Sequence, residues 1–237
     1  MRVGRREFTR YLLCVDVDDL SASSGGLASF LSTTDWAAMC SLGSRCLMAA
    51  DYPLFRQGDE GEHAYVILSG AVKVVRGEAA GKSAILTIRG AGDVVGDLAV
   101  MDGGRRSGTV STLTPMVVRV VQGASFKRFI ERPSVTAAYA RYTVNRLRQS
   151  DVQRTEIAVL PVRQRLARAL LRLYVTADAA GGQRAFELPQ QDLAELIGAS
   201  RNAVVLALGV LRAEGVLDTH RMRVSILDVD ALHRQAG

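Results

Sequence analysis

One stretch of this 237-residue chain constrains its fold more than any other: residues 190–212 read QQDLAELIGASRNAVVLALGVLR. Apolar residues recur at helical spacing on both sides of Gly198. They are Leu193, Ala194 and Ile197 before it, and Val204, Ala207, Leu208 and Leu211 after it. Glycine tolerates the backbone of a sharp turn, and Ser200 is a good N-cap for the helix that follows. The stretch therefore predicts two short helices packed across a turn, the outline of a DNA-binding helix-turn-helix.

The second predicted helix would present a mixed face to a DNA groove. The residues that point away from the first helix are Arg201, Asn202, Val205, Leu206 and Gly209. Arginine suits guanine and asparagine suits adenine, whereas the aliphatic side chains offer contact only to thymine methyl groups. This face is more apolar than that of a strong DNA reader, which predicts an altered operator or weak DNA binding.

Neighbouring basic residues are candidates for contacts to DNA phosphates. The full set of predicted DNA-contacting residues is Ser200, Arg201, Asn202, Val205, Leu206, Arg212, Arg221 and Arg223, with His220 as a further candidate. For each basic residue at the helix end and beyond, a solvated surface charge is the alternative. The formal net charge is +6, and most of the excess lies in the second half of the chain. This distribution favours binding to a polyanion.

Composition limits the class of protein further. The chain is 48% hydrophobic and 23% charged, which is ordinary for a soluble domain. No apolar run reaches the roughly 18 residues of a membrane span, and the N-terminus does not have the pattern of a signal peptide. Cys14, Cys40 and Cys46 lack the spacing of a zinc or iron–sulfur site. With no constellation of catalytic groups either, we expect a cytoplasmic protein that is not an enzyme and binds no metal.

The order of patterns along the chain predicts an α+β fold. Residues 1–27 form an extension that ends in a Ser/Gly-rich linker, and residues 28–50 are expected to be helical. Between residues 51 and 122, short apolar runs alternate with Gly/Asp-rich turns, which favours a β-roll or jelly roll. The apolar runs are HAYVILSG, AVKVV, SAILTI and PMVVRVV.

The second half is predicted to be mainly helical. Residues 134–158 contain neither Gly nor Pro and predict one long helix, which ends before Pro161. Shorter helices are expected at 124–131 and 162–176, a loop at 178–183, and a hairpin or wing at 215–227. The predicted domains are an extension (1–27), a β-roll (28–133), a long helix (134–160) and a winged helix-turn-helix (161–237).

A second stretch, RGAGDVVGDLAVMDGGRRSGTV at residues 89–110, carries a candidate anion site. The residues concerned are Gly96, Asp97, Leu98, Ala99, Arg106 and Ser107. The first four would open a short helix directly after a turn, where backbone N–H groups can hold an anion. The last two offer a charge-assisted contact to a phosphate, and the carboxylate can accept from a sugar hydroxyl. Together they predict a pocket for a sugar phosphate; taken singly, a turn-forming Asp and a solvated Arg pair are the alternatives.

Three motifs in this order resemble the cyclic-AMP receptor protein / FNR (CRP/FNR) family of bacterial transcription regulators. They are FRQGDEGEHAYVILSGAVKV, GAGDVVGDLAVMDGGRRS and LPQQDLAELIGASRNAVV. The resemblance implies a homodimer joined through the long helix, a palindromic double-stranded operator, and RNA polymerase as a further partner. It also implies a phosphate-binding cassette, in which a Gly-Glu pair clasps a ribose and an Arg-Ser pair binds a cyclic phosphate.

Carried onto this chain, the cassette has one departure from the family pattern. Gly96 and Asp97 take the Gly-Glu place, and Arg106 and Ser107 take the Arg-Ser place. Asp97 is one methylene shorter than Glu, so the resemblance supports phosphate binding better than ribose binding. Cyclic AMP is the expected effector, with cyclic GMP as the second choice. The cysteine set of the family's iron–sulfur members is absent, so no metal is expected.

The resemblance also assigns residues outside the cassette. On the long helix, Ser150 falls at the family's Thr place and Asp151 at its Ser place, both against the purine. Asp151 can accept from an exocyclic amine or repel a second anion. In the DNA reader, Arg201 matches the family pattern, whereas Asn202 replaces a Glu and Leu206 replaces a second Arg.

The expected molecule is a homodimeric, nucleotide-controlled transcription regulator. The apolar contact along the long helix would come from Tyr139, Tyr142, Leu147 and Ile157. Because charged residues interrupt any clean heptad, the dimer is expected to need help from the β-roll or the ligand. Two alternatives remain open: a ligand-independent regulator with a vestigial pocket, and a nucleotide-binding scaffold whose helix-turn-helix no longer reads DNA.

Overall fold

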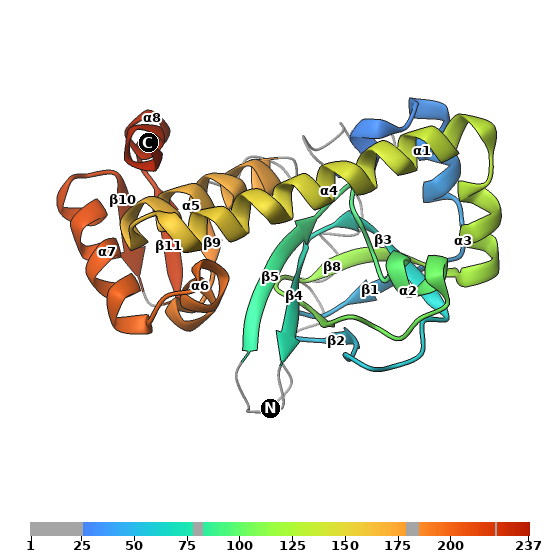
Figure 1. Ribbon diagram of the computed structural model, residues 1–237, viewed down its shortest axis with the longest axis horizontal. Helices are drawn as coiled ribbons and strands as arrows, with labels where there is room; N and C mark the ends of the chain where they lie inside the picture. The colour runs from blue at the N-terminus through green and yellow to red at the C-terminus, as the bar shows by residue number, and fades with distance from the viewer. Residues whose placement is uncertain (1–25, 78–82, 179–184, 221) are drawn as a thin grey trace, which may run out of the picture.

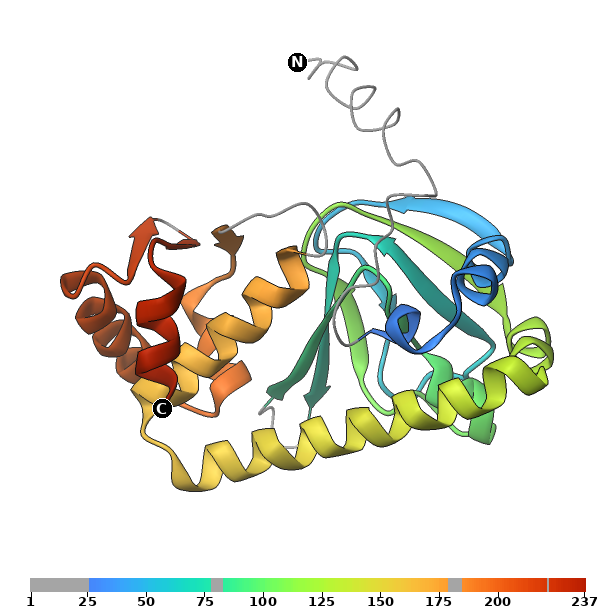
Figure 2. The same ribbon diagram turned by 90° about the horizontal axis from the view of Figure 1, so that it is seen from above.

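The computed structural model describes residues 26–77, 83–178, 185–220 and 222–237. Cys14, Arg221, and most of the predicted extension (1–27) and loop (178–183) lie outside these residues. The described chain has three parts: a β-roll, a C-terminal domain, and the helix α4 (Pro133–Val159), which runs past the β-roll to the C-terminal domain (Figure 1). Figure 2 shows the full length of α4 along one side of the molecule.

The β-roll consists of two four-stranded antiparallel sheets, in the orders β1-β8-β3-β6 and β2-β7-β4-β5. Its strands are β1 (Ser44–Met48), β2 (Pro53–Phe55), β3 (His63–Ser69), β4 (Ala71–Gly77), β5 (Ser83–Gly90), β6 (Val94–Val95), β7 (Thr109–Thr112) and β8 (Met116–Gln122). All four apolar runs noted in the sequence form strands, namely β3, β4, β5 and β8. The predicted β-roll is therefore confirmed, although β1, β2, β6 and β7 were not foreseen individually.

The predicted helix over residues 28–50 is wrong in its second half. The structure has a short 3-10 helix, η2 (Leu27–Phe30), then α1 (Thr33–Cys40), and the chain then enters strand β1. Gly43 has a φ of 60°, and a Cβ at this position would collide with the carbonyl oxygen of Val120. Pairing of the whole of β1 with residues 116–120 of β8 then replaces the helix. A tertiary contact thus outweighs the local helical tendency of this segment.

Short helices and α4 enclose the apolar core of the β-roll. They are α2 (Asp97–Asp102), α3 (Gly123–Ile130) and the α1 and η2 segments. The side chains of Phe126, Phe129, Met39 and Leu27 are almost fully buried beneath them. The first half of α4 packs on this core through Val135, Tyr139 and Tyr142. This packing holds the first half of the helix on the β-roll.

Two residues predicted to make a dimer contact are instead buried within the chain. Tyr139 is 9% exposed and Tyr142 is fully buried, both against the β-roll. Their rings pack on the Phe side chains of η2 and α3, and their hydroxyls bond to carboxylates of the roll. The prediction for these two tyrosines is therefore wrong, whereas Leu147 and Ile157 remain 59% and 47% exposed.

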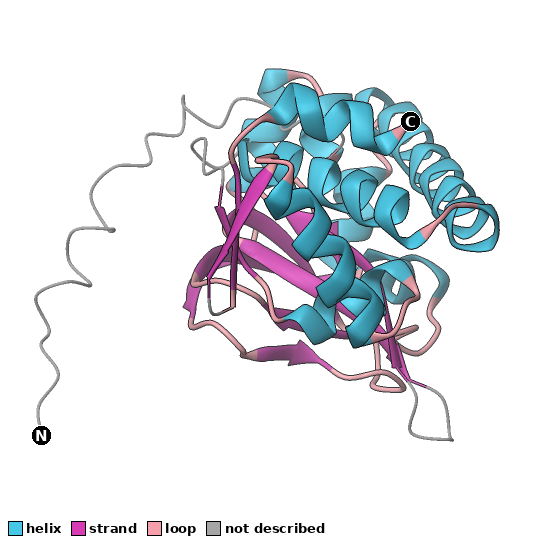
Figure 3. Ribbon diagram, turned by 90° about the vertical axis from the view of Figure 1, so that its left-hand side faces the viewer, coloured by secondary structure: helices cyan, strands magenta, loops and turns pink. Residues whose placement is uncertain are grey.

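The C-terminal domain combines a helix-turn-helix with a small sheet. Figure 3 views the molecule from the side of this domain, with helices in cyan and strands in magenta. The elements of the domain are α5 (Val162–Asp178), β9 (Ala185–Glu187), α6 (Gln190–Ile197), α7 (Arg201–Ala213), β10 (Leu217–His220), β11 (Arg223–Ile226) and α8 (Val229–Ala236). Strands β10 and β11 form the predicted wing, and β9 extends it in the order β10-β11-β9. No single helix among the described residues is long and apolar enough to cross a membrane. The bent pair α6–α7 meets that test by length and composition only.

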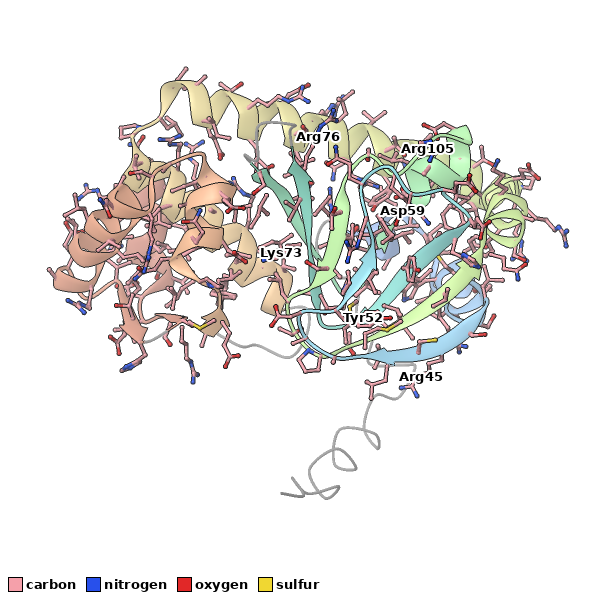
Figure 4. All side chains as sticks on the ribbon, turned by 90° about the horizontal axis from the view of Figure 1, so that it is seen from below. Arg45, Tyr52, Asp59, Lys73, Arg76 and Arg105 are labelled. Carbon is pink, nitrogen blue, oxygen red and sulfur yellow. The ribbon has the colours of Figure 1, made fainter. Side chains whose placement is uncertain are left out.

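The β-roll and the C-terminal domain contact each other directly. Lys73 Nζ of β4 lies 2.6 Å from Asp192 Oδ2 of α6, and the two side chains are only 23% and 12% exposed. Figure 4 labels Lys73 at this boundary. Ile88 and Leu113 of the roll pack against the C-terminal core. At Gly90, a Cβ would lie 2.5 Å from the Thr176 methyl group, so the close approach of β5 to α5 requires glycine.

Candidate functional site

A left-handed glycine positions the cassette, residues 96–107. Gly96 caps α2 with a φ of 78°. A Cβ at this position would lie 2.5 Å from Arg106 Nη1 and 3.1 Å from the His63 carbonyl oxygen. Only glycine fits here without strain, because the position combines a positive φ with a packed neighbour. The turn thus brings Asp97, the first residue of α2, next to the buried Arg106.

Arg106 is a buried cation without a carboxylate partner among the described residues. The residue is 5% exposed, and its two terminal nitrogens donate to the carbonyl oxygens of Gly96 and His63, each at 2.7 Å. Its Cζ lies 4.2 Å from the centre of the Phe55 ring, while its Nε has no hydrogen-bond partner in the described chain. Burial lowers the pKa of Arg106 from its ordinary value, but arginine remains charged in proteins. Asp59 and Asp97 are near enough to oppose this shift, but the guanidinium forms no ion pair with a described carboxylate.

Asp97, in contrast, is paired with helix α4 through one of its carboxylate oxygens. Its Oδ2 accepts from the Tyr139 hydroxyl at 3.0 Å and from Arg146 Nη1 at 2.8 Å. The Asp97 side chain is only 2% exposed. Burial alone would lower the pKa of Arg146, but the Asp97 carboxylate raises it above its ordinary value. This ion pair ties the cassette to α4.

A second buried carboxylate, Asp93, faces Tyr142, which lies between Tyr139 and Arg146 on α4. Asp93 accepts from the Tyr142 hydroxyl at 2.7 Å, and Arg89 lies 3.5 Å away. Burial raises the pKa of Asp93, and burial together with the Asp93 carboxylate raises the pKa of Tyr142 well above its ordinary value. The two tyrosines therefore stay neutral and act as hydrogen-bond donors.

The other predicted cassette residues have different environments. Leu98 is 43% exposed and Ser107 is exposed, whereas Ala99 is buried. Behind α2 lies a groove of about 560 Å³; of the predicted residues, only Ala99 lines it. Arg105 does line this groove, and its Nη1 donates to the Gly58 carbonyl at 2.9 Å. In Figure 4, Arg105 lies near Asp59 on the roll.

Within one chain, the two predicted purine-contacting residues differ in their exposure to solvent. Ser150 is half-buried on α4, one turn beyond Arg146. Asp151 is exposed, and its carboxylate lies 3.6 Å from Arg154. Asp151 lines a groove of about 290 Å³ with Val152 and other residues at the end of α4, and no cassette residue lines that groove. The single chain therefore does not bring Asp151 to the cassette, and its role stays a prediction.

Sequence reasoning missed the roles of three α4 residues, two of which contact the cassette and one the neighbouring Asp93. Tyr139, Tyr142 and Arg146 are spaced three and four residues apart, so they share one face of the helix. This spacing was visible in the sequence, but it does not reveal which carboxylates the face meets. Only the packing of α4 on the roll supplies that information.

The helix-turn-helix has the geometry that the sequence predicted. Gly198 ends α6 in the left-handed region with a φ of 61°, and the Ser200 hydroxyl caps α7 by accepting from the Ala203 N–H at 3.2 Å. Helices α6 and α7 turn by 103° relative to each other, within the range of helix-turn-helix motifs. All seven apolar residues assigned to their contact are buried. Arg165 of α5 also donates to the Ile197 carbonyl at 2.9 Å, which fixes the end of α6.

The predicted reading face of α7 is open to solvent. Arg201 and Asn202 are exposed, and Val205 and Leu206 are 43% and 73% exposed. The other described candidates, Ser200, Arg212, His220 and Arg223, are also exposed. In the described chain His220 Nε2 lies 3.0 Å from Asp218 Oδ2. The face therefore presents two polar side chains at the start of α7 and an apolar surface after them.

Comparison with known proteins identifies both halves of this architecture. The profile of the cyclic nucleotide-binding domain matches residues 47–133, and that of the Crp-like helix-turn-helix domain matches residues 164–235. The chain is 30% identical to the cyclic AMP receptor protein of Thermus thermophilus over 166 residues, which cover 70% of this chain and 75% of the relative. The chain belongs to the CRP/FNR family.

Other members of the CRP/FNR family agree with this assignment. A CRP-like cAMP-activated global transcriptional regulator of Mycobacterium tuberculosis is 29% identical over 198 residues, covering 80% of this chain and 88% of the relative. The crystal structure of a CRP-family regulator from Thermus thermophilus superposes with a TM-score of 0.69 at 25% identity, covering 81% and 96% of the two chains. This chain is accordingly a CRP-type transcription regulator with a cyclic nucleotide-binding domain and a helix-turn-helix domain.

Proposed function

We propose that this protein is a homodimeric transcription regulator of the bacterial cytoplasm, whose DNA binding is controlled by a cyclic nucleotide in the β-roll. The observation that carries the proposal is the buried guanidinium of Arg106, which is 5% exposed and, among the described residues, donates to two backbone carbonyls and forms no ion pair. A buried charge is costly unless it is paired. The phosphate of a cyclic nucleotide would pair with the guanidinium, and the neighbouring Ser107 hydroxyl would add a second contact.

The choice of nucleotide rests on the relatives. Two of them are named as cAMP-activated or cyclic AMP receptor proteins, so cyclic AMP is the first candidate and cyclic GMP the second. No metal takes part in the proposed recognition. The described residues contain no cluster of three or more His, Cys, Asp or Glu side chains suited to a metal ion.

The proposed dimer uses the outer face of α4. Apolar side chains on this helix are solvent-exposed in the single chain: Val144 is 48%, Leu147 59% and Val152 53% exposed. Exposed apolar side chains on one long helix favour pairing with a second copy. A dimer would present two α7 helices to a palindromic operator, and RNA polymerase is the further partner of such a regulator.

The Arg106 assignment is tested by calorimetry with cyclic AMP and cyclic GMP. Arg106→Ala should abolish nucleotide binding, because the phosphate loses its cationic partner. Arg105→Ala is the matched control, since this neighbouring side chain is exposed and donates only to the Gly58 carbonyl. Unchanged affinity in Arg106→Ala, or equal losses in both variants, would contradict the proposal.

Two observations favour alternative functions. Asp97 and Arg106 are almost fully buried, which favours a ligand-independent regulator with a vestigial pocket. Leu206 is 73% exposed on the reading face, which favours a scaffold that no longer reads DNA. Selection from random duplexes, with and without cyclic nucleotides, separates the three functions. Enrichment without any effect of nucleotide indicates the first alternative, and absence of enrichment indicates the second.

A further inference from the structure

One face of α7 points away from the rest of the C-terminal domain and carries aliphatic side chains. Asn202, Leu206 and Gly209 follow each other along the middle of this face at helical spacing, and Val205 and Val210 flank them. Leu206 is 73% exposed, Val205 43% and Val210 41%. Adjacent exposed aliphatic side chains are typical of a surface that contacts a partner. The partner of this face therefore has apolar groups to offer.

The charges around this face narrow the choice of partner. Helix α7 has an exposed arginine near each end, Arg201 and Arg212, and no acidic residue between them. The acidic residues Asp192 and Glu195 of the preceding helix α6 are directed to the β-roll instead. Asp192 forms its ion pair with a lysine of β4, and Glu195 accepts from the Ser83 hydroxyl at 3.3 Å. An apolar centre between positive ends suits a DNA groove, because phosphates flank the bases there.

We propose that α7 recognises its operator through the C5-methyl groups of pyrimidines, which Leu206 and Val205 contact. The inference rests on the proposed function, in which α7 enters the major groove of DNA. Thymine alone among the four bases presents a methyl group in that groove. Arg201 and Asn202 make no side-chain hydrogen bond within the described chain, so they are available to neighbouring purines.

Gly209 supports a close approach of this face to the bases. A Cβ at this position would meet no atom within 4 Å, so packing within the described chain does not require glycine there. Glycine in a helix nevertheless costs about 1 kcal/mol relative to alanine. The residue lies one turn after Leu206, and without a side chain at this point the helix can lie deeper in the groove. Leu206 is then the side chain that reaches the methyl groups.

The inference defines the kind of operator that the protein selects. Thymines should lie beside the purines that Arg201 and Asn202 read. Uracil lacks the C5-methyl group, so it should be a poor substitute for a contacted thymine. 5-Methylcytosine carries the same group at the same ring position, so methylation of cytosine at such a position should strengthen binding. Each methyl group that is removed from the contact should cost about fourfold in affinity.

The test measures the affinity of the full-length protein, with cyclic AMP and at fixed salt, for the duplex most enriched in a selection from random sequences. Each thymine is replaced by uracil in turn, a change that removes only the methyl group. Affinity should fall about fourfold at the contacted positions and stay constant elsewhere. At the contacted positions, a 5-methylcytosine–guanine pair should bind about fourfold more tightly than a cytosine–guanine pair.

Protein variants show whether α7 causes this effect. Leu206→Ala should remove the sensitivity to uracil at one position, and Val205→Ala should remove it at another. Val210→Ala is the matched control, because Val210 is as exposed as Val205 but lies beyond Gly209 on the same helix. It should leave the sensitivity to uracil unchanged. Sensitivity that persists in both Leu206→Ala and Val205→Ala would overturn the inference, since the methyl group would then act through the shape of the DNA.

The outcomes also distinguish this inference from the proposed function. If the selection enriches no sequence, the proposed function fails and the inference fails with it. The apolar face of α7 would then belong to a contact with another protein. If a sequence is enriched but uracil is tolerated at every thymine, the proposed function stands and the inference alone is overturned.

Discussion

At the scale of single residues, two glycines of the helix-turn-helix have opposite roles. A Cβ on Gly209, within α7, would meet no atom within 4 Å, whereas Gly198 has a φ of 61° and its Cβ would lie 3.2 Å from Ile157 Cγ2. Gly209→Ala should therefore raise the free energy of unfolding by about 1 kcal/mol, because alanine is the better helix former. Gly198→Ala should lower it, because alanine is strained in the left-handed region. Urea unfolding of both variants checks the pair, and destabilisation by Gly209→Ala would contradict it.

In the proposed function, base recognition depends on single residues at the start of α7. Arg201→Ala should cost about 1–3 kcal/mol in operator binding and relax specificity at one base pair. Arg223→Ala, in the wing, should weaken binding to all sequences alike and reduce its salt dependence. Competition assays with operator and random duplexes at several salt concentrations measure both effects. Equal losses on specific and random DNA for Arg201→Ala would show that it contacts phosphate only.

At the scale of elements, α4 has two faces with separate tasks. One face is buried on the β-roll through Tyr139 and Tyr142. The other face carries exposed apolar residues such as Leu147 and is the proposed dimer contact. Leu147→Asp should shift the protein from dimer to monomer in analytical ultracentrifugation at micromolar concentration, because it places a charge in the apolar contact. Leu227→Asp is the control, since Leu227 is 56% exposed but lies outside α4. A monomeric unmodified protein, with and without nucleotide, would rule out the dimer.

At the scale of the whole molecule, an ion pair between described residues joins the β-roll to the C-terminal domain. Lys73→Met should cost about 1.5–3 kcal/mol of unfolding free energy, because it leaves the partly buried Asp192 without its charged hydrogen-bond partner. The exposed pair Arg163–Glu214 is the control: its side chains are 46% and 40% exposed, so Arg163→Met should cost less than about 1 kcal/mol. Calorimetric unfolding measures both variants. Equal costs would show that the domain contact contributes no more than a surface pair.

The sequence by itself determined the features that depend on neighbouring residues. The turn at Gly198, the cap at Ser200, the long helix over 134–158 and the run of short strands follow from local backbone preferences and hydrophobic period. They formed as predicted, with α4 at Pro133–Val159. The motifs also sufficed to recognise the family.

Only the tertiary structure decided which faces are buried and which charges pair. Tyr139 and Arg146 reach Asp97 from positions 42 and 49 residues away in sequence. Residues 44–48 became a strand because β8 was available to pair with them. Local patterns predict that such faces exist, but not what they meet, because the partner depends on how distant segments pack together. The sequence therefore sufficed to identify Asp97 as a candidate site residue, but it could not reveal the contacts of Asp97 with Tyr139 and Arg146 of α4.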